Sequence, residues 1–194
     1  MAVKNLCQVA DAGHAIEFVA NLHRGLDTVV LRASELGPAP DCKIGCSHCC
    51  YVRVEATDPE IFRVARQVRQ LPASEVTDLT ERLRLHVAKD SAGSIDAKQG
   101  CTFLVNNLCT IYEVRPAACR KAHSLSVEQC ETFAPEISQN LRLIVEAEAL
   151  MAGTSDAYHE ISLLASAHEL NSAVLVALND DTAEARWYNG ENIF

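Results

Sequence analysis

The sequence predicts a mainly α-helical protein in which several helices pack around irregular, cysteine-rich loops. Aromatic residues make up only 5% of the chain, and segments that alternate apolar and polar residues, as half-buried strands do, are few. Apolar residues instead recur at helical spacing over long segments. The 194 residues can bury an ordinary core without cross-links. We therefore expect a single domain over residues 1–194, with a cysteine-cluster core at 42–120 and a helical C-terminal part at 121–194.

Helix start and stop signals divide the N-terminal half. Gly37-Pro38 ends the first helical pattern, because proline cannot continue a helix. The run Thr-Asp-Pro-Glu at 57–60 combines a polar cap, a proline in the first turn and a glutamate three residues after the cap, which is a strong helix start. Pro72 separates this helix from the next, which Ser74 can cap. The expected elements are helices at 14–36, 57–70 and 74–89 and a short extended segment at 51–55.

The C-terminal half carries two longer apolar patterns. We expect the first to form a helix that Gly153 ends, and the second to form the longest helix, which the polar run at 179–181 stops. Ser126, with Gln129 three residues later, marks a shorter helix start. The expected elements are a short helix from Ser126, helices at 135–151 and 155–178, and a tail that docks through Trp187, Tyr188 and Phe194.

The charge and the absence of long apolar segments limit the partners and the compartment. The formal net charge is −9 and the pI is near 5.2, so we expect neither nucleic acid nor an anionic membrane surface as a main partner. No stretch of about 20 apolar residues predicts a membrane span, and residues 1–20 do not read as a secretory signal. The cytoplasm is the expected location, where cysteines indicate metal or redox chemistry more often than disulfides.

Most of the nine cysteines fall into two blocks. The first block is Cys42-x3-Cys46-x2-Cys49-Cys50, and the second is Cys101-x7-Cys109-x9-Cys119. Two thiolates two or three residues apart can fold around one ion, and Gly45 can relieve the turn where a positive φ is needed. The spacing therefore predicts a metal site whose candidate ligands are Cys42, Cys46, Cys49, Cys50, Cys101, Cys109 and Cys119.

Thiolate ligands indicate which metals to expect. They favour zinc, copper(I) or an iron–sulfur centre over magnesium or calcium. One zinc or one four-iron cluster needs four thiolates, so a binuclear site with a shared sulfur, two separate sites, and one site with spare thiols all stay open. His48 can replace a cysteine as a ligand. Candidates to balance the negative charge are Lys43, Arg115, Arg120 and Lys121. Cys7 and Cys130 are expected to be buried free thiols.

These blocks also resemble the YkgJ-type cysteine-cluster family of zinc- or iron-chelating domains. The resemblance covers the first block, Cys101-Thr-Phe-Leu, and Cys109-Thr-Ile-Tyr-Glu-x-Arg-Pro-x2-Cys119-Arg, in that order, and extends with less support to the tail at 186–194. It implies that the seven cysteines named above bind a metal. A related motif occurs in flagellin lysine-N-methylases, but those chains are much longer, so methylation is not carried over.

Three functions stay open on the sequence alone. The first is a zinc- or iron-binding protein without chemistry of its own. The second is an iron–sulfur redox or radical-type enzyme or electron carrier, and the third is an interaction module that a metal stabilises. We assign no catalytic residue and no organic cofactor site, because no Walker loop, dinucleotide fingerprint or nucleophile elbow is present. His123 is expected to be a solvated surface histidine.

Overall fold

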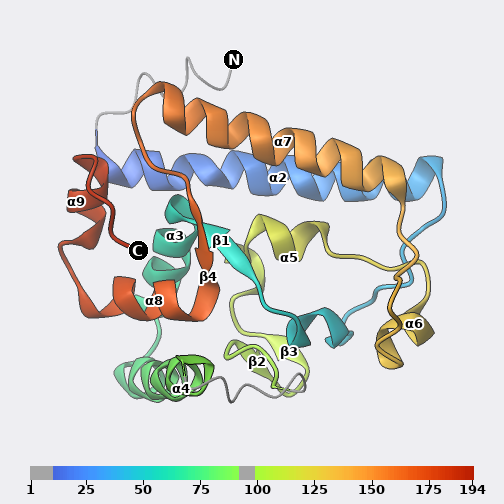
Figure 1. Ribbon diagram of the computed structural model, residues 1–194, viewed down its shortest axis with the longest axis horizontal. Coiled ribbons are helices and arrows are strands. Elements are labelled where there is room, and N and C mark those ends of the chain that lie inside the picture. The colour runs from blue at the N-terminus through green and yellow to red at the C-terminus, as the bar shows by residue number, and fades with distance from the viewer. Residues whose placement is uncertain (1–10, 92–98) are drawn as a thin grey trace.

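The computed structural model describes residues 11–91 and 99–194, and its fold is mainly α-helical, as expected (Figure 1). Cys7 lies outside the described residues. The helices are α2 (Ala12–Leu36), α3 (Asp58–Arg69), α4 (Ala73–Ser91), α5 (Ala117–Lys121), α6 (Val127–Glu131), α7 (Leu141–Glu160), α8 (Leu170–Asn179) and α9 (Ala183–Tyr188), with the 3₁₀ helices η1 (His48–Tyr51) and η2 (Tyr112–Val114). The strands are β1 (Glu55–Thr57), β2 (Leu104–Val105), β3 (Leu108–Cys109) and β4 (Ala167–Glu169).

The two long helices α2 and α7 lie side by side and antiparallel (Figure 1). At one end the Tyr158 hydroxyl donates to the Ala15 carbonyl at 2.7 Å. At the other end the side-chain amide of Asn140 donates to the carbonyls of Ala33 and Pro38 at 3.3 and 3.0 Å. Midway, a Cβ at Gly25 would lie 3.3 Å from a Leu150 methyl, so glycine permits the close approach. The pair is therefore fixed along its whole length.

Helix α3 occupies the centre of the molecule, between α2 and α8. Its start is the capping box that the sequence indicates: the Glu60 carboxylate accepts from the Thr57 N–H at 3.0 Å. Strand β1 precedes this start and pairs antiparallel with β4. Phe62 is fully buried and contacts the rings of Trp187 and Phe194, with centroids 5.4 and 5.3 Å away. The C-terminal tail therefore docks through its aromatic residues.

The predicted helix boundaries after residue 135 are wrong. Helix α7 begins at Leu141, where the Asn140 side chain accepts from the Leu143 N–H, and it passes through Gly153 to Glu160. A glycine inside a helix costs only about 1 kcal/mol, and packing on α2 offsets that cost. The expected helix 155–178 is interrupted, because Ser162 adopts a positive φ of 61° and Ala167–Glu169 form β4.

The segment after α2 also differs from the expectation. The extended segment predicted at 51–55 lies later, at Glu55–Thr57, and a 3₁₀ helix at His48–Tyr51 precedes it. A short hairpin, β2–β3, was not predicted. Its turn residues Asn106 and Asn107 have φ values of 52° and 61°, which asparagine tolerates better than most residues. Within the described ranges, no helix combines the length and apolar character that crossing a membrane requires.

Candidate metal centre

The two cysteine blocks lie on the same side of the molecule, with η1, β2–β3, α5 and α6 and away from α9 (Figure 1). Cys42 and Cys46 lie in the loop after α2, and η1 carries Cys49 and Cys50. In the second block, Cys101 precedes β2, Cys109 ends β3 and Cys119 lies in α5. The Cys101 N–H donates to the Cys50 carbonyl at 2.7 Å. One backbone hydrogen bond thus joins the blocks directly.

Local turns shape the first block. The Cys46 N–H donates to the Lys43 carbonyl at 2.9 Å, and the Cys50 N–H donates to the Ser47 carbonyl at 2.9 Å. Gly45 has a φ of +86°, so the turn uses the freedom that only glycine has without strain. Cys42 and Cys49 are exposed. The block is therefore a pair of tight turns that present thiols at the surface.

The second block is anchored in the core. Phe103 is fully buried beside Cys101, and both the N–H and the hydroxyl of Thr110 donate to its carbonyl at 2.9 and 3.0 Å. Cys101 and Cys109 pack against the main hydrophobic cluster. The two Thr110 hydrogen bonds therefore close the base of the β2–β3 hairpin, and the buried Phe103 side chain and the two cysteines attach the hairpin to the apolar core.

A buried carboxylate holds α5, and with it Cys119. Glu60 accepts from the Ala117 N–H at 2.6 Å and faces His23 Nε2 at 3.1 Å. Arg63 donates to His23 Nδ1 at 2.8 Å, so the histidine proton lies on Nε2 and is donated to Glu60. Burial raises the pKa of Glu60, but these hydrogen bonds outweigh it and hold the pKa below its ordinary value. Burial lowers the pKa of His23, which stays neutral.

Arg120 ties the same helix to α2. Its guanidinium contacts both carboxylate oxygens of Asp27 at 2.8 and 2.9 Å and donates to the carbonyls of Glu113 and Arg115. The sequence suggested it as a charge-balancing group for the thiolates. In the structure its hydrogen-bonding capacity is committed to the scaffold, and Lys121 is likewise paired with Glu148.

Among the described residues, Arg115 is a cation whose charge reaches thiols of both blocks. Its guanidinium lies 3.6 Å from the centre of the Tyr112 ring, an arrangement that fixes the cation in place. Its positive charge lowers the pKa of Cys49 and counteracts the rise that burial causes at Cys109. The charge of Arg115 therefore favours the thiolate form of one cysteine in each block.

Cys49 is the thiol of the cluster whose pKa is lowered most among the described cysteines. A hydrogen bond from the Cys50 thiol lowers the pKa of Cys49 to about 6, and the same bond raises the pKa of Cys50. Burial raises the pKa of Cys101 to about 11 and that of Cys119 to about 12, with the charge of Cys49 acting in the same direction. Thiols from both blocks thus interact with one another.

The described thiols lie in one region of the molecule, but they do not point at a common centre. The eight described cysteines are free. In the part of the chain that the structure describes, no three histidine, cysteine, aspartate or glutamate side chains are close enough to share a metal ion. The donor set fits zinc or iron–sulfur chemistry by its type, because thiolates are soft ligands. Ligation requires the thiols to draw together.

Cys130 belongs to the same region, which sequence reasoning missed. Helix α6 packs against η1, and the charge of Cys130 contributes to the raised pKa of Cys42, for which burial is the main cause. His48 Nε2 lies 3.9 Å from the Glu131 carboxylate of this helix, so an acidic side chain faces the histidine proposed as an alternative ligand. A lone cysteine outside a spaced motif carries no signal of its own in sequence.

The prediction for His123 is wrong. The side chain is 8% exposed, and its Nε2 accepts from the Asn140 N–H at 2.8 Å while Nδ1 donates to the Lys121 carbonyl at 2.8 Å. The histidine is a buried link between α5 and the start of α7. Both of its ring nitrogens are used in these two hydrogen bonds.

Fold and site together define a mainly α-helical protein with clustered cysteines in the loops on one side. Residues 41–138, just over half of the chain, match the CxxCxxCC family, described as a "putative zinc- or iron-chelating domain". The chain belongs to this family, which confirms the resemblance predicted from the cysteine blocks, and the matched range includes Cys130. No curated protein and no solved structure matches the chain significantly.

Proposed function

We propose that this protein binds zinc or an iron–sulfur centre through its clustered cysteines. The proposed ligands are drawn from Cys42, Cys46, Cys49, Cys50, Cys101, Cys109 and Cys119, and Cys130 is an additional candidate. The observation that carries the proposal is the backbone hydrogen bond that joins the two blocks, in which the Cys101 N–H donates to the Cys50 carbonyl at 2.7 Å. Family membership supports metal chelation in general.

Ligation would bring the exposed first block onto the anchored second block. In the first block, Cys42 and Cys49 are exposed and Cys46 and Cys50 are partly buried, so rotations of these side chains would turn the thiols toward the second block. Arg115 then offsets part of the negative charge that several thiolates carry. Zinc bound there would supply a rigid four-coordinate link, whereas an iron–sulfur cluster would supply electron transfer.

Elemental analysis with a visible spectrum tests the proposal on protein purified without oxygen. Zinc near one or two equivalents with no visible band indicates a structural or chelating role. Iron with acid-labile sulfide and a broad band near about 400 nm indicates an iron–sulfur centre. Neither metal in the purified protein, and no uptake of zinc or iron after reduction of the thiols, would contradict the proposal.

A further inference from the structure

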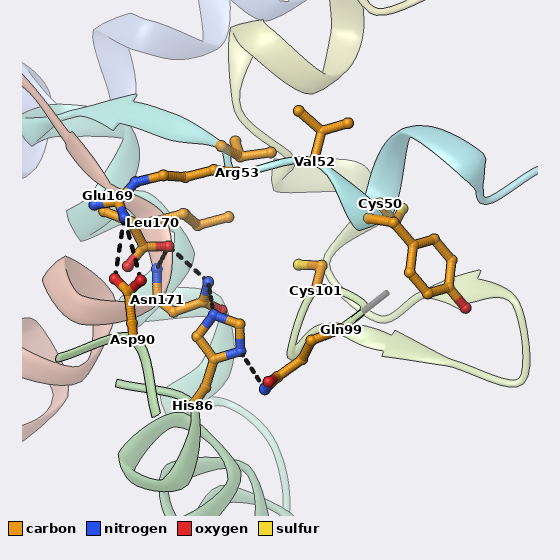
Figure 2. A pocket seen from close by; sticks show the side chains of 12 residues that line it. Cys50, Val52, Arg53, His86, Asp90, Gln99, Cys101, Glu169, Leu170 and Asn171 are labelled. Carbon is orange, nitrogen blue, oxygen red and sulfur yellow. Dashed lines mark hydrogen bonds and ion pairs between the residues drawn. The ribbon is translucent and has the colours of Figure 1, made fainter. Parts of the chain in front are cut away.

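Cys50 of the first block and Cys101 of the second block border one cavity. The cavity has a volume of about 230 Å³, and Figure 2 shows the two cysteines at the same side of it. The opposite wall comes from the C-terminal part of α4 and the β4–α8 junction. Both thiols are free, and both residues are only partly buried. A small reagent in the cavity can therefore approach both side chains.

The backbones of these two cysteines are held close together. The Cys101 N–H donates to the Cys50 carbonyl at 2.7 Å. With standard bond lengths, this contact keeps the two Cα atoms within about 6.6 Å of each other, inside the range of about 4.4–6.8 Å that disulfides span. The next residues along the two segments are close as well, because a Cβ at Gly100 would lie 3.2 Å from the Tyr51 ring. The two segments therefore pass each other with Cys50 beside Cys101.

Local hydrogen bonds fix each of the two backbones in addition. The Cys50 N–H donates to the Ser47 carbonyl at 2.9 Å, and the Leu104 N–H donates to the Cys101 carbonyl at 2.9 Å. Rotation of the two side chains between staggered χ1 positions is then the movement that brings the sulfurs together. No displacement of the core is needed for it.

Other cysteines are less suitable partners for Cys50. Cys49 is its neighbour in the chain, and a ring closed through the intervening peptide would strain that planar trans bond. Cys109 lies in the hairpin, and no backbone hydrogen bond among the described residues joins it to the first block. Cys101 is therefore the partner that the backbone favours.

We propose that Cys50 and Cys101 form a redox-active pair, which a small disulfide entering the cavity oxidises to a disulfide between the two blocks. One protein thiol attacks the reagent and forms a mixed disulfide, and the second protein thiol then displaces the remaining half of the reagent. One Sγ–Sγ bond forms and the S–S bond of the reagent breaks. The protein gives up two protons and two electrons, which leave with the two reagent thiols.

The oxidation needs only the two thiols, so the inference goes beyond metal binding. Both cysteines are also among the proposed metal ligands, so the disulfide and a metal bound by them would exclude each other. That consequence alone rests on the proposed function. A metal would then link the two blocks in the reduced protein, and a covalent bond would link them in the oxidised protein.

Peptide mapping by mass spectrometry tests the pair on full-length protein treated with a chelator, so that a bound metal does not protect the thiols. Hydroxyethyl disulfide is the oxidant, added in small steps, and the remaining thiols are alkylated in acid. The first intramolecular disulfide to form should join Cys50 to Cys101. A different first pair, such as Cys49 with Cys50, or mixed disulfides alone, would overturn the proposal. The mapping needs no bound metal, so its failure would leave the proposed metal binding standing.

Two variants of the second block separate this pair from general thiol oxidation. Cys101→Ser removes the partner and should lose the cross-link between the blocks. Cys109→Ser makes the same change in the neighbouring hairpin and should keep that cross-link. Equal cross-linking in the two variants would count against the proposal. Should circular dichroism show that a variant or the chelator-treated protein has lost its helices, the same mapping on the wild type as purified decides, and the absence of the Cys50–Cys101 disulfide there would also count against it.

Discussion

The two cysteine blocks differ in how they are held. The second block is attached to the core through buried Phe103, through Glu60 and through Arg120. The first block is held by its own turns and by a few backbone contacts, such as the Asp41 N–H donating to the Ser124 carbonyl at 2.8 Å. Core side chains therefore position the second block, whereas the first block has mainly local hydrogen bonds.

This difference suggests that folding positions the second block and that metal ligation would order the first block. The core positions the second block, because hydrogen bonds to Glu60 and Asp27 hold α5 and the buried Phe103 side chain holds the hairpin. The first block has exposed thiols and little apolar anchoring, so ligation would contribute most of its order. Metal removal should therefore loosen one block and spare the other.

The largest effect is expected from Glu60→Ala. The substitution removes the acceptor shared by His23, Thr57 and Ala117 and should lower the free energy of unfolding by about 3–5 kcal/mol, as breaking a buried charged network does. Urea unfolding at neutral pH measures it. Glu35→Ala, on the exposed end of α2, is the control and should change stability by about 0.5 kcal/mol or less. A loss similar to the control would show that Glu60 does not anchor α5.

Arg120→Met should have the next largest effect. It keeps much of the side-chain volume but removes the contacts to Asp27 and to two carbonyls, at a cost of about 2 kcal/mol. Arg142→Met breaks an exposed pair with Glu146 and should cost about 0.5 kcal/mol or less. Urea unfolding of both variants decides. Equal losses would mean that the second block is not anchored through Arg120.

A smaller effect is expected from pH. The pKa of Glu60 lies below its ordinary value of 4.5, so its stabilisation is present above that pH and is lost as the pH falls toward the folded-state pKa. The advantage of the wild type over Glu60→Gln should shrink below about pH 4.5. Asp58, whose pKa is raised mainly by burial, is present in both proteins and largely cancels. An advantage that stays constant to pH 3, measured by urea unfolding, would exclude this linkage.

The smallest effect on the metal-free protein is expected from Cys46→Ser. Cys46 lies in a surface turn, so without metal the free energy of unfolding should change by about 0.5 kcal/mol or less. In the metal-loaded protein, metal content and melting temperature should fall together. Cys7→Ser, outside both blocks, should keep its metal. Full metal content and unchanged melting in the Cys46 variant would remove it from the ligand set.

Local signals explain which parts of this fold could be predicted. Ser126 caps α6 by accepting from the Gln129 N–H, and the capping box at Thr57 starts α3, because these contacts span three residues. The break at Ser162 and the β4 strand depend on pairing with β1, more than 100 residues away, which apolar spacing cannot reveal. The cysteine spacing within each block is likewise a local signal and suggested a metal site, whereas the position of Cys130 beside η1 depends on the packing of α6 and could not be predicted.

The α2–α7 pair also has a consequence for the order of folding. Its terminal hydrogen bonds join residues 107 and 143 positions apart, and both cysteine blocks lie within the intervening chain. Closing loops of this length loses chain entropy before the helix contacts form, and folding slows as contacts become less local. The helices α3 and α4 can form from local signals early, whereas the long pair closes late. Its closure then encloses the segment that carries the two blocks, so the thiols would assemble only near the end of folding.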